Sequence, residues 1–235
     1  MFWLAVWWLA ALAVGKSLLI PAPPEVVRTL GALVVSAPFW RYTALTLRRI
    51  TLGLLIGIAA GVVTAVLTSR SALLYALLAP AVRVVRATPV ASFIILVLLW
   101  VAKGRVPAVI AGLVVLPIVW ENTTAGLRSV DPSLMEMARV YRFTRLDTLR
   151  HVVLPAMLPS LSAAVCTAIG LAWKSGVAAE VLCLPQAAIG TQVYHSKLYL
   201  DTPALFAWTI VVVALSMTLE QLARRLLLGR GEAKR

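Results

Sequence analysis

The sequence predicts an all-α, polytopic membrane protein with about six transmembrane helices, and three observations support this fold class. Hydrophobic residues make up 61% of the 235 residues, whereas soluble domains contain roughly 45–50% apolar residues. The mean hydropathy is +0.94, and several apolar runs approach or exceed the ~20 residues that a helix needs to cross a bilayer. The charged residues are concentrated between these runs, as in loops that join membrane helices.

The charge balance limits the classes of partner. The chain has 22 Lys and Arg against 9 Asp and Glu, which gives a net charge of +13. In a membrane protein, excess basic charge is first a topology signal, because cytoplasmic loops carry it. Nucleic-acid binding is the other interpretation of a basic chain, but no polar basic domain lies outside the apolar segments. We therefore expect the lipid bilayer and no nucleic acid as a partner, and a single membrane domain over residues 1–235 with its core at 43–228.

The first predicted membrane helix covers residues 2–20. No Lys or Arg precedes this long run, and its tryptophans suit a membrane interface. A cleaved signal peptide is the competing interpretation. Prolines then interrupt the helix, and a short amphipathic helix is expected at residues 25–35.

The second predicted membrane helix covers residues 43–68 and contains Gly53, Gly57 and Gly61 at a spacing of four. Small residues at this spacing let two helix backbones approach closely in lipid. The remaining segments are an amphipathic piece at 69–86, a third membrane helix at 88–101, a fourth at 106–127 that Pro117 can kink, a fifth from 155 or 159 to 182, and a sixth at 202–228.

The longest polar stretch covers residues 131–161 and contains two helix-start signals. Asp131 or Ser133 can cap a first helix, and Glu136, three residues after Ser133, would complete a capping box. Thr144 and Asp147 form a second capping-box pattern. The stretch therefore predicts two short helices with a bend around residues 142–144.

This stretch resembles the EAA loop of ABC importer permeases, the membrane subunits of binding-protein-dependent transporters. Glu136-Met137-Ala138 stands at the Glu-Ala-Ala positions, Val152 at the Ile, and Leu154-Pro155 at the Leu-Pro of that pattern, with every spacing kept. Arg142 stands at the pattern's Gly, where a left-handed turn costs a residue with a Cβ roughly 1–2 kcal/mol. Residues 46–53, 86–104 and 121–126 also resemble permeases of the nitrate, sulfonate and taurine type.

The resemblance implies a translocation subunit that works with two ATPase subunits, a second permease copy and an extracytoplasmic binding protein. The loop at 131–155 would be the cytoplasmic coupling loop, in which Leu134, Ala138 and Tyr141 follow helical spacing and can bury against a groove of the ATPase. The residues that the resemblance assigns to ATPase contact are Glu136, Met137, Ala138, Arg139, Tyr141, Arg142, Phe143, Leu154 and Pro155.

No catalytic constellation is present in the sequence, so an enzyme is not expected. A glycine-rich phosphate loop is missing, and ATP and Mg²⁺ are therefore expected on the partner ATPase, with no cofactor in this chain. Cys166 and Cys183 do not have metal-site spacing, and no metal site is expected.

Five residues are candidates for the translocation path or its gate: Asn122, Lys174, Ser175, Gly176 and Glu180. A Gly beside a small polar residue can break a membrane helix, and broken backbone inside a membrane must face protein or water. We therefore expect residues 175–180 to face the dimer axis near the outer gate. The alternative for Lys174 is that its long side chain reaches outward to the interface.

The two intramembrane charges, Lys174 and Glu180, also suit an ion-coupled secondary transporter, which is the alternative function. The resemblance to the EAA loop favours an ATPase-coupled importer instead. It also fixes the expected orientation in the inner membrane, with both termini cytoplasmic. The distribution of Lys and Arg among the loops favours this orientation only modestly.

Overall fold

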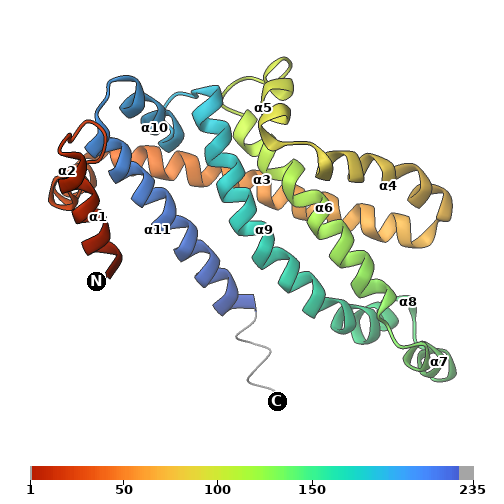
Figure 1. Ribbon diagram of the computed structural model, residues 1–235. Helices are drawn as coiled ribbons and strands as arrows, with labels where there is room; N and C mark the ends of the chain where they lie inside the picture. The colour runs from red at the N-terminus through yellow and green to blue at the C-terminus, as the bar shows by residue number, and fades with distance from the viewer. Residues whose placement is uncertain (1, 228–235) are drawn as a thin grey trace.

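The computed structural model describes residues 2–227, which form helices and no strand (Figure 1). The helices are α1 (Phe2–Val14), α2 (Pro23–Val35), α3 (Ala37–Arg70), α4 (Ala72–Ala87), α5 (Val90–Leu98), α6 (Val106–Arg128), α7 (Pro132–Val140), α8 (Arg145–Thr148), the π-helical turn η1 (Leu149–Val153), α9 (Leu154–Cys183), α10 (Ile189–Leu198) and α11 (Thr202–Leu227).

Four helical segments in the described residues are long and apolar enough to cross a membrane. They are α3, α6, the continuous segment Arg145–Cys183 and α11. The pair α4 and α5 makes a fifth span if the two are counted together. The membrane class is confirmed, with four or five complete spans rather than six.

The first predicted span is shorter than expected. Helix α1 has 13 residues, or about 20 Å at 1.5 Å per residue, against a hydrocarbon core of ~30 Å. It ends where Gly15 takes a positive φ of 63°, which stops a right-handed helix. Helix α1 lies against α11, where the Trp7 and Phe206 rings stack with centroids 5.7 Å apart.

The predicted third span at 88–101 corresponds to α5, and the predicted amphipathic piece at 69–86 corresponds to α4. The two helices make a membrane span only when they are counted together. Helices α4 and α5 meet at an angle of 104°. Pro89 lies at the break, and the residue before it, Thr88, is extended with ψ 131°. Proline disfavours the helical conformation in the preceding residue, so the bend falls where the sequence puts the proline.

Helices α3 and α6 pack side by side and run in the same direction. A Cβ added at Gly53 would overlap the Ala108 backbone, and one added at Gly61 would lie 2.8 Å from the Val119 Cβ. Gly57 meets the backbone of Gly112 in between. The predicted glycine contact surface is therefore confirmed, and α6 is the helix that it approaches.

The next two long helices alternate in direction. A Cβ at Gly126, late in α6, would meet Met157, early in α9. The Trp173 indole of α9 donates to the Val212 carbonyl of α11 at 3.0 Å, and Gly170 meets Glu220 further along. The ends of α3, α6 and α11 and the start of α9 therefore share one end of the bundle, here the α7 end. The loop before α10 lies at the opposite end, the α10 end.

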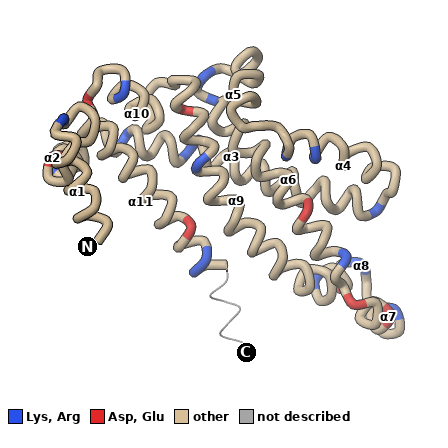
Figure 2. Tube along the Cα trace, viewed as in Figure 1, with Lys and Arg blue, Asp and Glu red and all other residues tan. Residues whose placement is uncertain are grey.

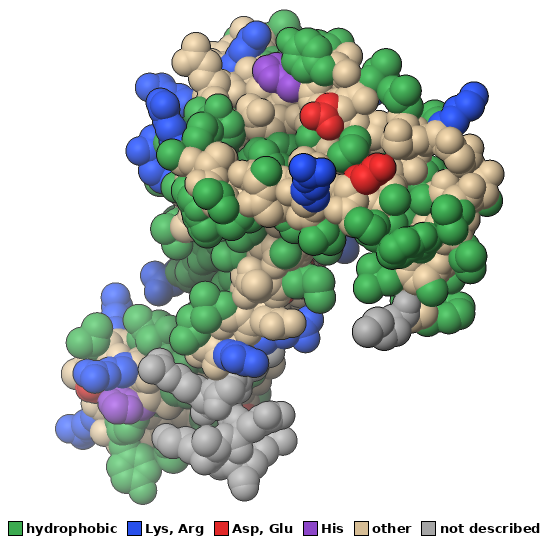
Figure 3. All heavy atoms as spheres, turned by 90° about the vertical axis from the view of Figure 1, so that its left-hand side faces the viewer, with side chains coloured by type: hydrophobic (Ala, Val, Ile, Leu, Met, Phe, Trp, Pro, Cys, Tyr) green, Lys and Arg blue, Asp and Glu red, His purple; other side chains and the backbone are tan. Residues whose placement is uncertain are grey.

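The main core lies where α3, α6, α9 and α11 meet. Its largest buried members are Phe39, Ile50, Trp173, Ile189 and Trp208. Large hydrophobic side chains such as Leu52, Leu55 and Ile56 remain exposed on the outside of α3, as a lipid-facing surface requires. Hydrophobic side chains cover much of the face shown in Figure 3, and Figure 2 shows long uncharged stretches in α9 and α11.

Candidate functional site

The loop that contains α7 and α8 is built by the two predicted helix starts. Asp131 caps α7, and its Oδ1 accepts a hydrogen bond from the Ser133 backbone N–H at 2.8 Å. This bond from Ser133 holds the pKa of the Asp131 carboxyl below its ordinary value. Thr144 and Asp147 form the predicted capping box at α8, with the Asp147 N–H donating to Thr144 Oγ1 at 3.2 Å. The cap of α7 is therefore Asp131 rather than Ser133.

Arg142 adopts the left-handed conformation that the Gly of the family pattern would adopt, with φ 54°. The Phe143 N–H donates to the Ala138 carbonyl at 2.8 Å, and the Arg142 N–H donates to the Arg139 carbonyl at 3.1 Å. These two bonds are the pair that defines a Schellman C-cap. The turn is thus the one that a Gly would form, and the protein tolerates the strain of an Arg in it.

The side chains of α7 divide into a buried and an exposed set. Ala138 is only 3% exposed, whereas Tyr141 is 71% exposed. Ala138 is therefore unavailable to a partner and instead holds α7 against its own loop, which corrects its expected place in a groove of the ATPase. The other assigned residues are exposed: Glu136, Met137, Arg139, Tyr141, Arg142, Phe143, Leu154 and Pro155.

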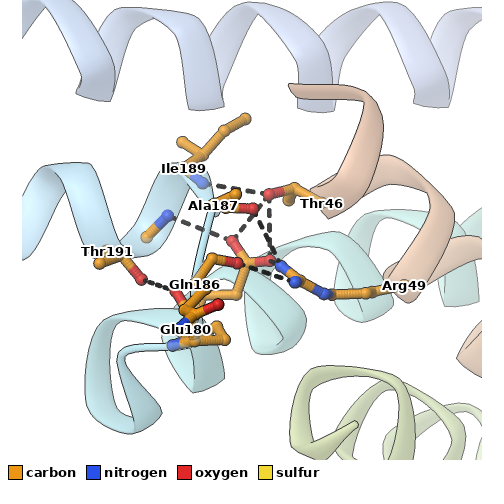
Figure 4. Close-up of polar contacts among 9 residues, drawn as sticks. Thr46, Arg49, Glu180, Gln186, Ala187, Ile189 and Thr191 are labelled. Carbon is orange, nitrogen blue, oxygen red and sulfur yellow. Dashed lines mark hydrogen bonds and ion pairs between the residues drawn. The ribbon is translucent and has the colours of Figure 1, made fainter. Parts of the chain in front are cut away.

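A second cluster lies at the α10 end and centres on Glu180, which is fully buried in α9 (Figure 4). The two carboxylate oxygens lie 2.9 and 3.0 Å from Thr46 Oγ1 of α3. One of them also accepts a hydrogen bond from the Gly190 N–H of α10 at 3.1 Å. Arg49 Nη1 lies 3.4 Å from the other oxygen. Glu180 therefore has a partner on each of two neighbouring elements, as a buried charge requires.

The same groups hold the turn between α9 and α10. Arg49 donates to the Gln186 carbonyl at 2.9 Å and to the Ala187 carbonyl at 3.2 Å. Ala187 and Leu184 both have φ 52°, a left-handed conformation for residues with a Cβ. Such residues cost of order 1 kcal/mol each and persist where the surroundings fix them. The carbonyl contacts of Arg49 supply that fixation at Ala187, and the Leu184 N–H donates to the Glu180 carbonyl at 3.0 Å.

The structure corrects the expected break in α9. The helix is continuous from Leu154 to Cys183, and Ser175 Oγ donates back to the Leu171 carbonyl at 2.8 Å. Gly176 serves close packing instead, since an added Cβ would lie 2.6 Å from Ile50 Cγ1 of α3. Ser175, Gly176 and Glu180 are buried in the protomer, whereas Lys174 is exposed.

Asn122 lies elsewhere, in the wall of a cavity of about 400 Å³ between α4, α5, α6 and α9. The polar lining groups are Arg86, Thr88, Glu121, Asn122 and Thr167. Arg86 and Glu121 in its wall form an ion pair. Leu171 also lines the cavity, and Lys174 follows it by about one helical turn on the same face of α9. The structure thus separates Asn122 and Lys174 from the Glu180 cluster.

Thr46 and Arg49 were not identified from the sequence as partners of Glu180. Arg86 was also not identified as the partner of Glu121. The available signal was a charge inside an apolar run: Arg49 lies within the predicted span at 43–68. A buried carboxylate in a membrane helix needs a cation or donors nearby. Which cation it meets depends on the packing of distant segments, since Arg49 and Glu180 are 131 residues apart in the sequence.

Comparisons with known proteins agree with this architecture. The family model described as "Binding-protein-dependent transport system inner membrane component" matches residues 53–227. The aliphatic sulfonates transport permease protein SsuC of Escherichia coli (strain K12) is 30% identical over 226 residues, covering 95% of this chain and 85% of that protein. The taurine transport system permease protein TauC of the same organism is 26% identical, covering 98% and 88%.

A solved structure gives the same fold. The crystal structure of an amino acid ABC transporter with histidines superposes with a TM-score of 0.61 at 21% sequence identity, covering 79% of this chain and 92% of that chain. The apolar helices define a multi-pass membrane protein, and the shared fold is that of the superposed chain. The chain belongs to the family of binding-protein-dependent transport system inner membrane components.

Proposed function

We propose that this chain forms the translocation path of an ATP-driven importer and couples to a cytoplasmic ATPase through the loop of α7 and α8. The observation that carries the proposal is the family match over residues 53–227, together with an exposed α7 in that family's EAA pattern. Figure 3 shows a lobe at the lower left that is rich in Lys and Arg side chains, as is typical of the cytoplasmic side of a membrane protein. ATP and Mg²⁺ would bind the ATPase subunits.

The connections of the loop suit force transmission. Helix α6 ends at Arg128, only three residues before the cap of α7. On the other side, Arg145–Cys183 forms one continuous helical segment of 39 residues through α8, η1 and α9. A displacement of the loop by the ATPase would therefore move α6 and α9, which are two of the four helices that line the cavity around Asn122.

The full transporter would contain two copies of this chain, two ATPase subunits and an extracytoplasmic binding protein. The α7 end would face the cytoplasm, with both termini on that side. The two relatives are named for the transport of aliphatic sulfonates and of taurine. The selectivity among such solutes would rest mainly with the binding protein.

An ion-coupled transporter without an ATPase has less support. Its best candidate for an ion-carrying group, Glu180, is held by Thr46, Arg49 and the Gly190 N–H. A carboxylate fixed on that many partners is suited to a structural role.

Reconstitution distinguishes the two functions. We expect proteoliposomes that contain this chain, its ATPase and its binding protein to transport a solute such as taurine only when ATP is present on the side of the membrane where the ATPase lies. The binding protein should also stimulate ATP hydrolysis. Uptake driven by an ion gradient without ATP would contradict the proposal.

A further inference from the structure

Two cavities follow one another along a single face of α6. The first is the cavity of about 400 Å³ that contains Asn122. The second, of about 590 Å³, lies nearer the α7 end between α4 and α6. Pro117, Glu121 and Arg128 line them in succession at helical spacing. Glu121 lines both cavities, so it stands at their junction.

The two cavities differ in character. The first has mostly apolar walls, including Phe93, Ile110 and Leu171. The second is basic and aromatic, lined by Arg83, Arg128, Tyr75 and Trp120. The Arg128 guanidinium lies 5.6 Å from the centroid of the Tyr75 ring, and the Tyr75 and Trp120 rings stack at 5.8 Å. The second cavity therefore has a fixed frame around an open, charged interior.

We propose that the ion pair between Arg86 and Glu121 is a gate that separates these two cavities. Arg86 comes from α4 and lines the first cavity, and Glu121 comes from α6 and lines both, so the pair joins the two helices where the cavities meet. This inference rests on the proposed function for its direction of transport. It adds the residues that close the path inside one protomer.

The strength of the pair suits a gate. The side chains of Arg86 and Glu121 are 64% and 40% exposed, and ion pairs that contact water contribute only about 0–1 kcal/mol. Among residues 2–227 the other ion pair is Arg49 with Glu180, whose side chains are 15% and 0% exposed. The first pair can therefore open at low cost, and the second cannot.

The surrounding elements supply a hinge and a drive. Arg86 lies just before the break at Thr88 and Pro89, where α4 and α5 meet at 104°. Helix breaks of this kind absorb changes in backbone angle. Glu121 lies about two turns before the end of α6, which leads directly into the loop of α7.

Thiol labelling tests the gate without a known substrate. The background is a Cys166→Ala, Cys183→Ala chain in the assembled transporter, in inside-out and right-side-out vesicles with a membrane-impermeant maleimide. Asn122→Cys reports on the first cavity and Ser129→Cys on the second. The vesicle type in which Ser129→Cys reacts defines the α7 side, so the gate is tested whichever way the chain is inserted.

From the α7 side, Asn122→Cys should react slowly while the ion pair is intact. Arg86→Glu or Glu121→Arg should raise its rate roughly fivefold, the change that loss of one partly exposed ion pair allows. The double charge swap should restore the slow rate. Arg83→Glu, on the same helix and in the second cavity, is the matched control and should leave the rate unchanged.

Three results would overturn the gate: an unchanged rate in both single variants, no restoration in the double swap, or an equal rise with Arg83→Glu. Failure of the proposed function looks different. In that case the labelling rate of Asn122→Cys would still depend on the charges at positions 86 and 121. It would not change when ATP or its trapping analogues are added.

Discussion

At the scale of single residues, Glu180 and Arg142 show two ways in which an unfavourable residue is kept. Glu180 is a buried charge whose desolvation is offset by a cation, a hydroxyl and a backbone N–H. Arg142 is a strained residue whose left-handed conformation is offset by two backbone hydrogen bonds at the end of α7. The effect of each residue can therefore be tested with a single substitution.

Removing the Glu180 carboxylate should destabilise the α10 end. Glu180→Ala leaves Arg49 mostly buried without its acid, a change that typically costs ~3 kcal/mol. We expect a lower thermal unfolding temperature in detergent, and a smaller further loss when Arg49→Ala is added than Arg49→Ala causes alone. Arg48→Ala is the matched control, because Arg48 is exposed. Additive losses in the double variant would mean that the two residues do not act together.

The strain at Arg142 predicts opposite effects of two substitutions. Arg142→Gly removes the Cβ and with it the strain of the left-handed conformation, whereas Arg142→Val places a β-branched side chain there. The two variants should differ by roughly 1–2 kcal/mol in the free energy of the turn. The Phe143 N–H, which bonds to the Ala138 carbonyl, should exchange with deuterium more slowly in the first variant and faster in the second. Arg139→Gly, inside α7, should speed exchange instead. Equal exchange in all variants would show that the turn does not carry this strain.

At the scale of helices, the local signals were readable and the long-range ones were not. The capping box at Thr144 and the glycine spacing of α3 are set by neighbours within one turn or by small residues along one face, so the sequence predicted them. The bend around residues 142–144 was predicted, but the Schellman form of its turn was not. The break at Pro89 falls between the two predicted segments, but its angle of 104° was not predicted, because proline permits both a kinked span and a sharp bend. The Ser175–Gly176 pair was misread because close packing on Ile50 and a helix break use the same residue types.

The glycine face of α3 should tolerate no side chain. A Cβ at Gly57 would lie 2.8 Å from both the Gly112 carbonyl oxygen and the Val115 Cβ, so α3 and α6 must separate. We expect Gly57→Ala to lower the unfolding temperature of the purified chain. Gly31→Ala is the matched control in α2, where nothing lies within 4 Å, and it should be neutral or stabilising by up to ~1 kcal/mol. A neutral Gly57→Ala would argue against this packing.

The exposed face of α7 should be the docking surface for the ATPase. Val140 and Tyr141 are 77% and 71% exposed beside Glu136, so Glu136→Lys reverses a charge in the middle of the proposed contact. We expect loss of stimulated ATP hydrolysis and of transport, with the permease still folded. Leu198→Asp, at the α10 end and 58% exposed, is the control. Full activity of Glu136→Lys would place the docking surface elsewhere.

At the scale of the whole molecule, the fold class and the family could be predicted because hydropathy and the EAA spacing are carried by the sequence itself. The role of each candidate path residue could not be, because it depends on which helix face meets which neighbour. Lys174 and Ser175 are adjacent in sequence, yet one is exposed and the other is buried. Only the three-dimensional packing separates the cavity side of α9 from the side that faces α3.

The cavity around Asn122 predicts how two copies assemble. One protomer supplies its walls from α4, α5, α6 and α9, and a closed path needs a wall on the remaining side. We expect a second copy related by a two-fold axis to supply the same face and close it, because such pairs are the commonest closed assemblies. Thr167 lies in the cavity wall, so in a chain free of Cys166 and Cys183 we expect Thr167→Cys to form a disulfide-linked dimer on oxidation. Thr209→Cys, exposed on α11, should remain monomeric. Intact-complex mass measurement that finds two different permease chains, or equal cross-linking of both variants, would contradict the homodimer.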